Sequence, residues 1–103
     1  MCQILTTTEF SEWFKKQTVK TQVQIDTRLE RIKDFGHFGE AKHLGQKLAE
    51  LKWKNGLRIY FSIERDESYN VILILIGGNK NSQKKDIKHA RKILFLHTNK
   101  GQL

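Results

Sequence analysis

The chain has 103 residues of which 38% are hydrophobic, enough for one thin core and too few for a second, so we expect a single domain over residues 1–103. Nineteen Lys and Arg against eleven Asp and Glu give a formal net charge of +8. Such a surface attracts polyanions, so we expect nucleic acid as the first partner and an acidic protein as the second. The alternative is that the excess charge only makes the protein more soluble.

The first elements are predicted to be a strand and two helices. Residues 3–7 fit a short edge strand, and Thr8 fits the N-cap of a helix. This helix turns Phe10, Trp13 and Phe14 to one face. After a break at residues 16–18, a second helix carries Ile25, Leu29 and Ile32 inward at helical spacing and ends at Gly36. The two helices are expected to form a hairpin.

A β-hairpin follows the loop at residues 36–39. In residues 50–54, Leu51 and Trp53 point one way and Glu50, Lys52 and Lys54 the other. Asn55-Gly56 predicts a type I′ turn, because both residues tolerate a positive φ. The returning strand, residues 57–64, alternates between two faces. One face carries Leu57, Ile59, Phe61 and Ile63, and the other carries Arg58, Tyr60 and Ser62.

The last elements are a central strand and a helix. Residues 65–68 fit a charged turn, residues 71–76 are apolar on both faces as a central strand requires, and residues 77–79 should end that strand. A final helix is expected to begin near Asn81 or Ser82 and to fray after His97. It buries Ile87, Ala90, Ile93 and Leu94. The predicted fold is therefore α+β, with a small antiparallel sheet of three to four strands.

Cysteine content and targeting features predict a cytoplasmic protein without a membrane partner. The single cysteine, Cys2, excludes an intrachain disulfide and a multi-cysteine zinc site. The first residues lack the charged start and long apolar stretch of a signal peptide, and the longest aliphatic run, residues 71–76, is far too short to cross a bilayer.

Basic side chains gather around the predicted β-hairpin. Lys52, Lys54, Arg58 and Tyr60 occupy polar faces on either side of one tight turn, where cross-strand neighbours come within about 5 Å at Cβ. Cations held so close repel one another unless an anion lies between them, and a phosphodiester supplies that anion. The alternative is an ordinary solvated face that limits aggregation.

The start of the last helix favours the anion-binding interpretation. Lys80, Lys84 and Lys85 stand where the helix dipole is positive, and each costs about 0.3–1 kcal/mol. A phosphate there would meet free backbone N–H groups together with the lysines. Because the penalties are small, tolerated surface lysines remain the alternative.

The histidines do not form an obvious site. His37, His43, His89 and His97 have no spacing typical of metal ligands, so we expect neither a metal nor another cofactor. Surface or packing roles are predicted for all four, with His37 the strongest exception because it lies in a loop. Cys2 has no identifiable activating partner.

Four segments together resemble a known family. They are residues 8–14 (TEFSEWF), 36–42 (GHFGEAK), the hairpin residues 49–52 (AELK) with 56–61 (GLRIYF), and 77–87 (GGNKNSQKKDI). In this order they are similar to addiction-module killer proteins (HigB/RelE-like) of the RelE/ParE superfamily, and the match covers nearly the whole chain. The last segment is the most specific, whereas the hairpin is shared with the wider superfamily.

The resemblance implies a fold, a function and partners. It implies a β-α-α-β-β-β-α order and a type II toxin that is neutralised by an antitoxin encoded beside it, of the DNA-binding helix-turn-helix type. Characterised RelE-type members cleave messenger RNA without a metal, often on the ribosome, by attack of a ribose 2′-hydroxyl on the adjacent phosphate. The expected partners are therefore messenger RNA, the ribosome and the antitoxin.

Roles can be assigned to the basic residues on this hypothesis. Arg58, at the family's strand arginine, clamps the phosphate; Lys52 and Lys54 assist deprotonation or charge stabilisation; and Lys80 acts at the leaving group. The RNA-binding set comprises Lys42, Gln83, Lys84 and Lys85 on the backbone, with Tyr60 or Trp53 stacking on a base. The chain lacks the C-terminal tyrosine or histidine cluster of several RNA-cleaving relatives, so the general acid and base stay unassigned.

Two other functions remain open. A ParE-like toxin would block DNA gyrase with the same fold and no nuclease chemistry, although the basic strand face favours RNA. A non-toxic module that holds nucleic acid on its basic face is the second alternative.

Overall fold

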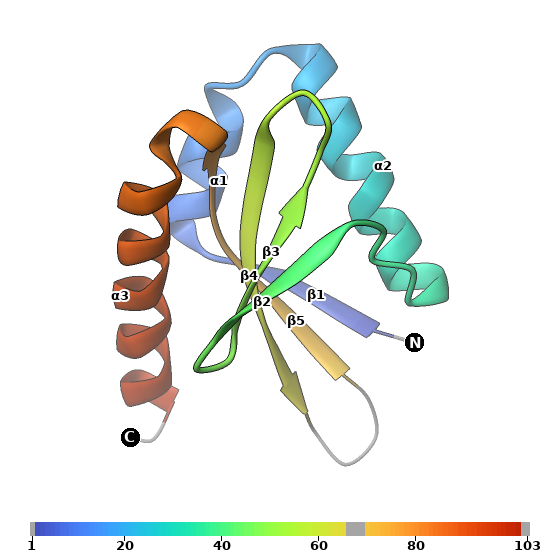
Figure 1. Cartoon of the computed structure of the whole chain (residues 1–103). Helices are drawn as coiled ribbons and strands as arrows, with labels where there is room; N and C mark the ends of the chain where they lie inside the picture. Colours follow the sequence, from blue (N-terminus) through green and yellow to red (C-terminus); the bar gives the residue numbers. More distant parts are fainter. Residues whose placement is uncertain (1, 66–69, 102–103) are drawn as a thin grey trace.

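The structure is a computed structural model that describes residues 2–65 and 70–101. Within these residues a mixed five-stranded sheet combines with three α-helices (Figure 1), which confirms the predicted α+β class. In chain order the elements are β1 (Cys2–Thr6), α1 (Thr8–Lys15), α2 (Val19–Phe35), β2 (Ala41–Gly45), β3 (Leu48–Lys52), β4 (Leu57–Arg65), β5 (Asn70–Asn79), the 3₁₀ turn η1 (Lys80–Ser82) and α3 (Gln83–Gly101). Most of the predicted charged turn, residues 66–68, lies outside the described residues.

The sheet has the strand order β1-β5-β4-β3-β2. The edge position of β1 is confirmed, and β5 lies inside the sheet between β1 and β4, which agrees with its two apolar faces. Two details of the predicted sheet are wrong: β1 pairs parallel to β5, and β2 is an additional strand. Strand β2 escapes prediction because its side chains are mostly exposed and show no alternation. The direction of β1 depends on where the chain returns after two helices, which no local pattern encodes.

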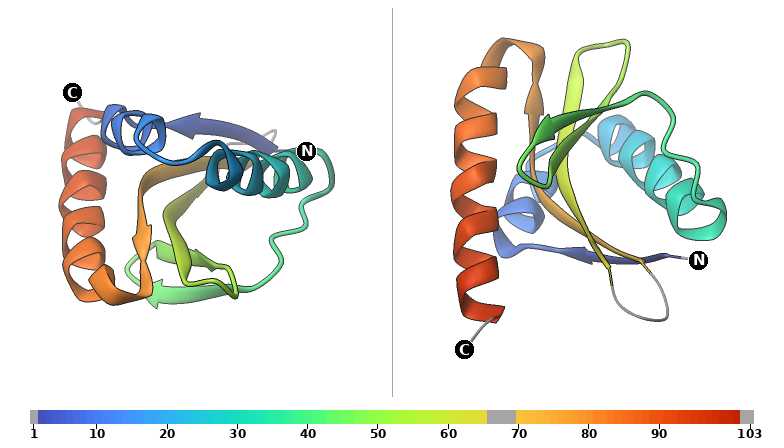
Figure 2. Two further views of the ribbon diagram at one scale, coloured as in Figure 1. Left: turned by 90° about the horizontal axis from the view of Figure 1, so that it is seen from above. Right: turned by 60° about the horizontal axis from the view of Figure 1, so that its bottom comes forward.

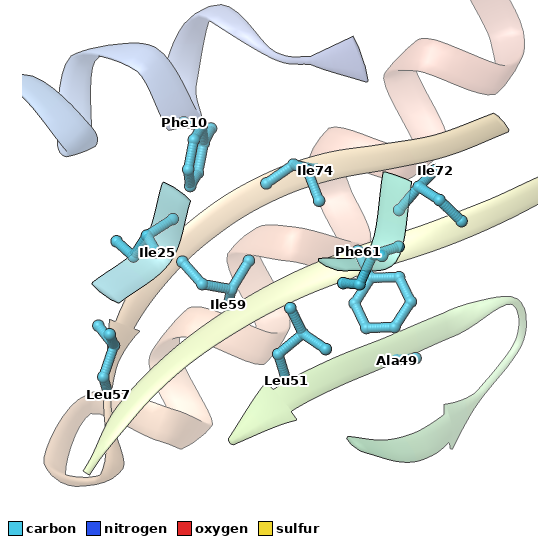
Figure 3. Close-up of a cluster of buried hydrophobic side chains, with 10 residues drawn as sticks. Phe10, Ile25, Ala49, Leu51, Leu57, Ile59, Phe61, Ile72 and Ile74 are labelled. Carbon is cyan, nitrogen blue, oxygen red and sulfur yellow. The ribbon is translucent and has the colours of Figure 1, made fainter. Parts of the chain in front are cut away.

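One face of the sheet packs against α1 and α2. The predicted inward residues of β4, among them Ile59 and Phe61, are buried there (Figure 3). Phe10 from α1 and Ile25 and Ile32 from α2 complete the cluster. Because burying one such side chain is worth about 1.5–3 kcal/mol, this cluster holds both helices on the sheet.

The opposite face is covered by α3 (Figure 2). The predicted inward residues Ala90, Ile93 and Leu94 are buried, and they pack with residues of β3, β4 and β5. Tyr60 and Ser62 lie on the same face of β4 as Arg58, as predicted, but both are fully buried, so the alternative of an ordinary solvated face does not hold for them. Alternation shows which side chains share a face, but not what covers that face.

The turn between β3 and β4 differs from the predicted type I′ turn. Gly56 has a positive φ of 98°, but Asn55 does not. The Gly56 N–H donates to the Trp53 carbonyl at 3.1 Å, and the Trp53 N–H donates to the Leu57 carbonyl at 3.1 Å. The loop therefore has three residues and ends in a glycine bulge. A two-residue loop would pair Trp53 with Arg58, whereas the extra residue pairs Lys52 with Arg58.

A two-residue turn with positive φ at both positions occurs instead between β2 and β3. Its central residues are Gln46 and Lys47, with φ of 52° and 68°. Neither is a typical residue for this conformation, so the sequence does not indicate it.

Helix boundaries are close to those predicted. The N-cap of α1 is Thr7 rather than Thr8, because the buried Thr7 hydroxyl accepts from the Phe10 N–H and donates to the Leu75 carbonyl at 2.6 Å. The predicted end of α2 is confirmed, with Gly36 left-handed at φ 70°. At the other end of the chain, α3 runs to Gly101 and so includes the residues after His97 that we expect to fray.

Gly77 and Gly78 do not end β5, which continues to Asn79. A Cβ on Gly77 would overlap the Trp13 ring, and a Cβ on Gly78 would overlap the Asp86 carboxylate. The glycines therefore permit close approach of α1 and α3 to a continuous strand.

Candidate functional site

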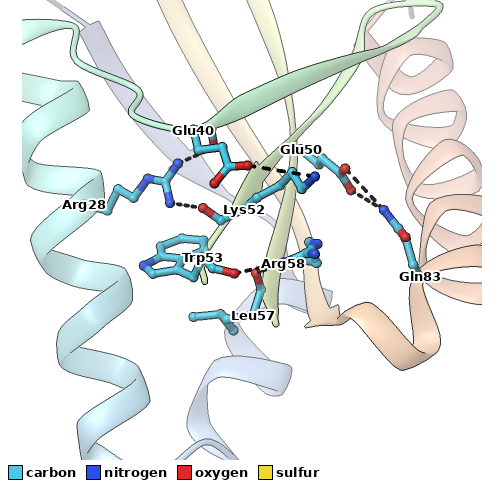
Figure 4. Close-up of polar contacts among 8 residues, drawn as sticks. All are labelled: Arg28, Glu40, Glu50, Lys52, Trp53, Leu57, Arg58 and Gln83. Atoms are coloured by element: carbon cyan, nitrogen blue, oxygen red, sulfur yellow. Dashed lines mark hydrogen bonds and ion pairs between the residues drawn. The ribbon is translucent and has the colours of Figure 1, made fainter. Parts of the chain in front are cut away.

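The end of the β3–β4 hairpin brings two predicted catalytic cations together. Lys52 and Arg58 are directly opposed across the two strands, on the face that α3 covers (Figure 4). The half-buried Arg58 donates from Nη1 to the Trp53 carbonyl at 3.1 Å and to the Leu57 carbonyl at 3.0 Å. Its buried Nε has no hydrogen-bond partner among the described residues. Backbone carbonyls of the turn, rather than a carboxylate, hold this guanidinium in place.

Lys52 is only weakly neutralised. Its Nζ lies 4.0 Å from a carboxylate oxygen of Glu40, and the two side chains are 30% and 62% exposed. An exposed pair at that distance contributes about 0–1 kcal/mol. The ammonium group is therefore free to exchange Glu40 for another anion.

Lys54 and Lys80 lie at the same end of the sheet as Arg58. Lys54 is exposed in the turn. The Lys80 N–H donates to the Gly56 carbonyl at 2.8 Å, and a Cβ on Gly56 would lie 3.4 Å from the Lys80 Cγ. The four predicted catalytic residues therefore surround one hairpin turn.

Glu50 is a buried carboxylate that sequence reasoning did not single out. It is fully buried on β3, opposite Tyr60, and both its oxygens accept from Gln83 Nε2, at 3.0 and 3.2 Å. Gln83, predicted to bind RNA, thus uses its amide to tie the start of α3 to β3. The alternation of β3 places Glu50 beside Lys52, but its burial depends on α3.

The two aromatic rings that were predicted to stack on a base, those of Tyr60 and Trp53, are largely covered by other parts of the chain. Tyr60 is fully buried and cannot reach a base, which corrects that prediction. Burial raises the pKa of its hydroxyl, and the negative charges of Glu50 and Asp86 raise this pKa further against an opposing contribution from Arg58. One face of the Trp53 ring is covered by the Arg28 guanidinium, 4.3 Å from the ring centroid.

The remaining predicted RNA-binding residues are exposed. Lys42 is opposite Glu50 in the β2–β3 pairing, and hence on the same face of the sheet as Lys52 and Arg58. Lys84 and Lys85 lie in the first turn of α3. The structure thus gathers exposed cations around the hairpin and the adjacent end of α3.

Arg28 is a second residue that sequence reasoning missed. From α2 it donates to three backbone carbonyls, those of Phe38, Glu40 and Lys52 (Figure 4). It thereby fixes both the loop before β2 and the end of β3 that carries Lys52. Its position in the middle of an amphipathic helix offers no signal for this role.

The histidines and acidic residues give no metal centre in the part of the chain that the structure describes. All four histidines are exposed, and no three His, Cys, Asp or Glu side chains of residues 2–65 and 70–101 are placed to hold one ion. Among the same residues, no helix is long and apolar enough to cross a membrane. At the hairpin, cationic side chains such as Lys52 and Arg58 can bind and stabilise anionic oxygens.

Comparisons with known proteins place the chain among uncharacterised relatives. No family model matches the sequence. An uncharacterized protein of Haemophilus influenzae is 33% identical over 92 residues, which is 86% of this chain and 89% of that protein. The solution structure of a conserved hypothetical protein from Helicobacter pylori is similar in fold, with a TM-score of 0.50 and 16% identity, over 81% of this chain and 99% of that chain.

Proposed function

We propose that the chain is a type II toxin of the RelE/ParE kind that cleaves RNA without a metal ion. The chain belongs to the same family as the uncharacterized protein of Haemophilus influenzae. In this proposal it acts in the cytoplasm on messenger RNA, free or on the ribosome, and a cognate antitoxin of the helix-turn-helix type neutralises it. The carrying observation is the cross-strand pair of Lys52 and Arg58 at the hairpin turn.

Three features of this pair and its surroundings support phosphate binding. The Arg58 guanidinium is oriented by two backbone carbonyls, so little conformational freedom is lost when it binds a phosphate. The only ion pair of Lys52 in the described residues is long and exposed. Lys54 and Lys80 add two exposed cations around the same turn. Four cationic residues therefore lie around one turn, and a phosphodiester bound there would carry one negative charge and gain a second during reaction.

The reaction requires no oxidant, reductant or second substrate, but it needs a general base and a general acid, which are not assigned to particular residues. The 2′-oxygen bonds to the adjacent phosphorus, the bond from phosphorus to the 5′-oxygen breaks, the 2′-hydroxyl proton leaves to a base and the 5′-oxygen gains a proton. Arg58 stabilises the doubly charged phosphorane, Lys52 and Lys54 assist charge stabilisation or deprotonation, and Lys80 acts at the leaving oxygen. The products carry a 2′,3′-cyclic phosphate and a 5′-hydroxyl.

The direct test is cleavage of a messenger RNA by the purified chain, once with ribosomes and once with the RNA alone. The reaction on the RNA alone contains a metal chelator, so that cleavage there does not depend on a metal ion. We expect new 5′-hydroxyl ends, and a rate lower by about 100-fold or more in Arg58→Ala, the usual loss when one transition-state donor is removed. Arg31→Ala, an exposed arginine of α2, should cleave at the original rate. Thermal unfolding shows whether Arg58→Ala remains folded, and Arg58→Lys retains the charge as a second variant.

Other outcomes would redirect the assignment. A folded Arg58→Ala chain that cleaves at the original rate would remove Arg58 from the mechanism. Intact RNA together with inhibited DNA supercoiling would favour a gyrase inhibitor. If expression causes no growth arrest that the neighbouring gene relieves, the toxin proposal is wrong and a non-toxic binding module remains.

A further inference from the structure

The outward face of α3 forms a basic stripe away from the hairpin turn. Ala90, Ile93 and Leu94 point into the core, so helical spacing places the exposed Lys85, Lys88 and Lys92 on the opposite side. The helix stands at the side of the sheet with this face open (Figures 1 and 2). This stripe, defined by the three lysines, lies on a helix with one acidic residue, Asp86, which accepts from the Ser82 hydroxyl.

The stripe carries charge that the chain itself does not neutralise. Lysines three and four residues apart on a helix repel one another by a few tenths of a kcal/mol. Among the described residues, no carboxylate lies within ion-pair distance of the three lysines. An anionic partner would turn this repulsion into attraction.

Beyond Lys92 the stripe is followed by two exposed apolar side chains, one of which lies beside a hollow. Phe95 is 63% and Leu96 47% exposed, although both are large apolar side chains. A hollow of about 440 Å³ lies next to Phe95, between α3 and the β2–β3 turn. Arg91 holds its wall in place, since it donates to the Leu44 carbonyl at 2.8 Å and to the Gly45 carbonyl at 3.2 Å. The hollow is thus a fixed feature that can receive a side chain.

We propose that this face of α3 is a docking surface for an acidic protein segment that presents a large apolar side chain. The apolar side chain enters the hollow beside Phe95, and carboxylates of the segment pair with Lys88 and Lys92. From Phe95 to Lys85 the helix rises by about 15 Å, so a short segment can follow the whole stripe. The inference goes beyond the proposed nuclease activity and holds whether or not the chain cleaves RNA.

The combination of charge and apolar surface selects this occupant. A second copy of the chain also carries a net charge of +8, so like charges oppose pairing through this stripe. An RNA strand would match the lysines and could stack a base on Phe95, but it offers no aliphatic side chain for the hollow or for Leu96. An acidic segment with one leucine or phenylalanine provides carboxylates for the lysines and an apolar side chain for the hollow.

The test is an NMR titration of the full chain with designed peptides of about four helical turns. The first peptide has glutamates along one face and leucines on the other, and the second has the same composition in scrambled order. We expect saturable shifts at Lys88, Lys92 and Phe95 with the first peptide, and at least tenfold weaker binding of the second. Phe95→Ser and the charge reversal Lys88→Glu with Lys92→Glu should each weaken the first peptide at least tenfold.

Matched variants on α2 control for nonspecific binding of the peptide to exposed apolar or basic side chains. Phe35→Ser removes an equally exposed phenylalanine, and Lys20→Glu with Lys33→Glu reverses two exposed lysines; neither should change peptide binding. The proposal is overturned if the first peptide shows no binding, if Phe95→Ser leaves its affinity unchanged, or if the scrambled peptide binds equally. It is also overturned if a single-stranded RNA or an anionic vesicle shifts the resonances of Lys88, Lys92 and Phe95 more strongly than the peptide does.

Discussion

Individual polar residues differ sharply in environment although they alternate along one strand. Arg58 and Tyr60 share a face of β4, yet Arg58 reaches the hairpin turn whereas Tyr60 is fully buried under α3. The Tyr60 hydroxyl has no hydrogen-bond partner among the described residues. Such a group loses its bonds to water without replacement, which costs about 1–3 kcal/mol. Tyr60 is therefore a residue whose polar atom destabilises the fold.

Tyr60→Phe should remove this cost and flatten the alkaline loss of stability. The Tyr60 pKa is raised in the folded chain, so above the ordinary tyrosine pKa of about 10 the unfolded chain releases a proton that the folded chain retains. Below that pH the hydroxyl is protonated in both states, and as the pH rises above it the folded chain loses stability because only the unfolded chain releases the proton. Urea unfolding at neutral pH and above the ordinary pKa checks this, with Tyr69→Phe as the control. An alkaline slope unchanged by Tyr60→Phe would contradict it.

At the scale of elements, the hairpin that carries the candidate site is held from both sides. Gln83 ties the start of α3 to Glu50 on β3. From the other side, Arg28 of α2 binds the backbone at Glu40 and Lys52 and covers the Trp53 ring. Burial lowers the pKa of Arg28, against the opposing charge of Glu40. The end of β3 is consequently fixed by two helices that belong to different faces of the sheet.

Arg28→Lys should therefore lower both stability and activity. A lysine cannot donate to three carbonyls in the fork geometry of arginine, and the loss of charged hydrogen bonds costs about 2 kcal/mol. We expect a lower urea midpoint, and slower RNA cleavage because Lys52 loses its backbone support. Arg31→Lys, three residues along the same helix and exposed, should change neither quantity. Equal midpoints for the two variants would show that the clamp is dispensable.

At the scale of the whole molecule, positive charge is concentrated at one side. Residues 80–92 contain six Lys and Arg and one Asp, out of a net charge of +8 for the chain. These residues border the hairpin turn with Lys52, Lys54 and Arg58. The field of the molecule therefore directs a polyanion toward the hairpin and α3 rather than toward α2.

RNA affinity should fall steeply with salt if this field and the proposed site act together. Four phosphate contacts, from Lys52, Lys54, Arg58 and Lys80, predict a slope of log affinity against log salt of about −3 for single-stranded RNA. Arg58→Ala should make the slope shallower by about 0.7, whereas Lys20→Ala on α2 should leave it unchanged. Fluorescence anisotropy of a labelled oligonucleotide over a salt series measures this. A slope near zero would mean that the cations do not contact phosphates.

Local periodicity determined much of the fold from the sequence alone. The alternation of β4, the buried face of α3 and the end of α2 at Gly36 were all predictable, because each depends on residues that are close together in the sequence. The proximity of Lys52, Lys54 and Arg58 followed from the hairpin signal at Asn55-Gly56. That signal misses the third loop residue, however, and only this residue sets Lys52 opposite Arg58.

The tertiary structure decided what covers each face. Alternation shows that Glu50, Lys52, Arg58 and Tyr60 share one side of the sheet, but α3 buries Glu50 and Tyr60 and leaves Lys52 and Arg58 partly open. The same holds for the parallel pairing of β1 and for the Arg28 clamp, which join segments far apart in the chain. Contacts between distant segments depend on how helices and strands pack, and a single sequence carries no periodic signal for them.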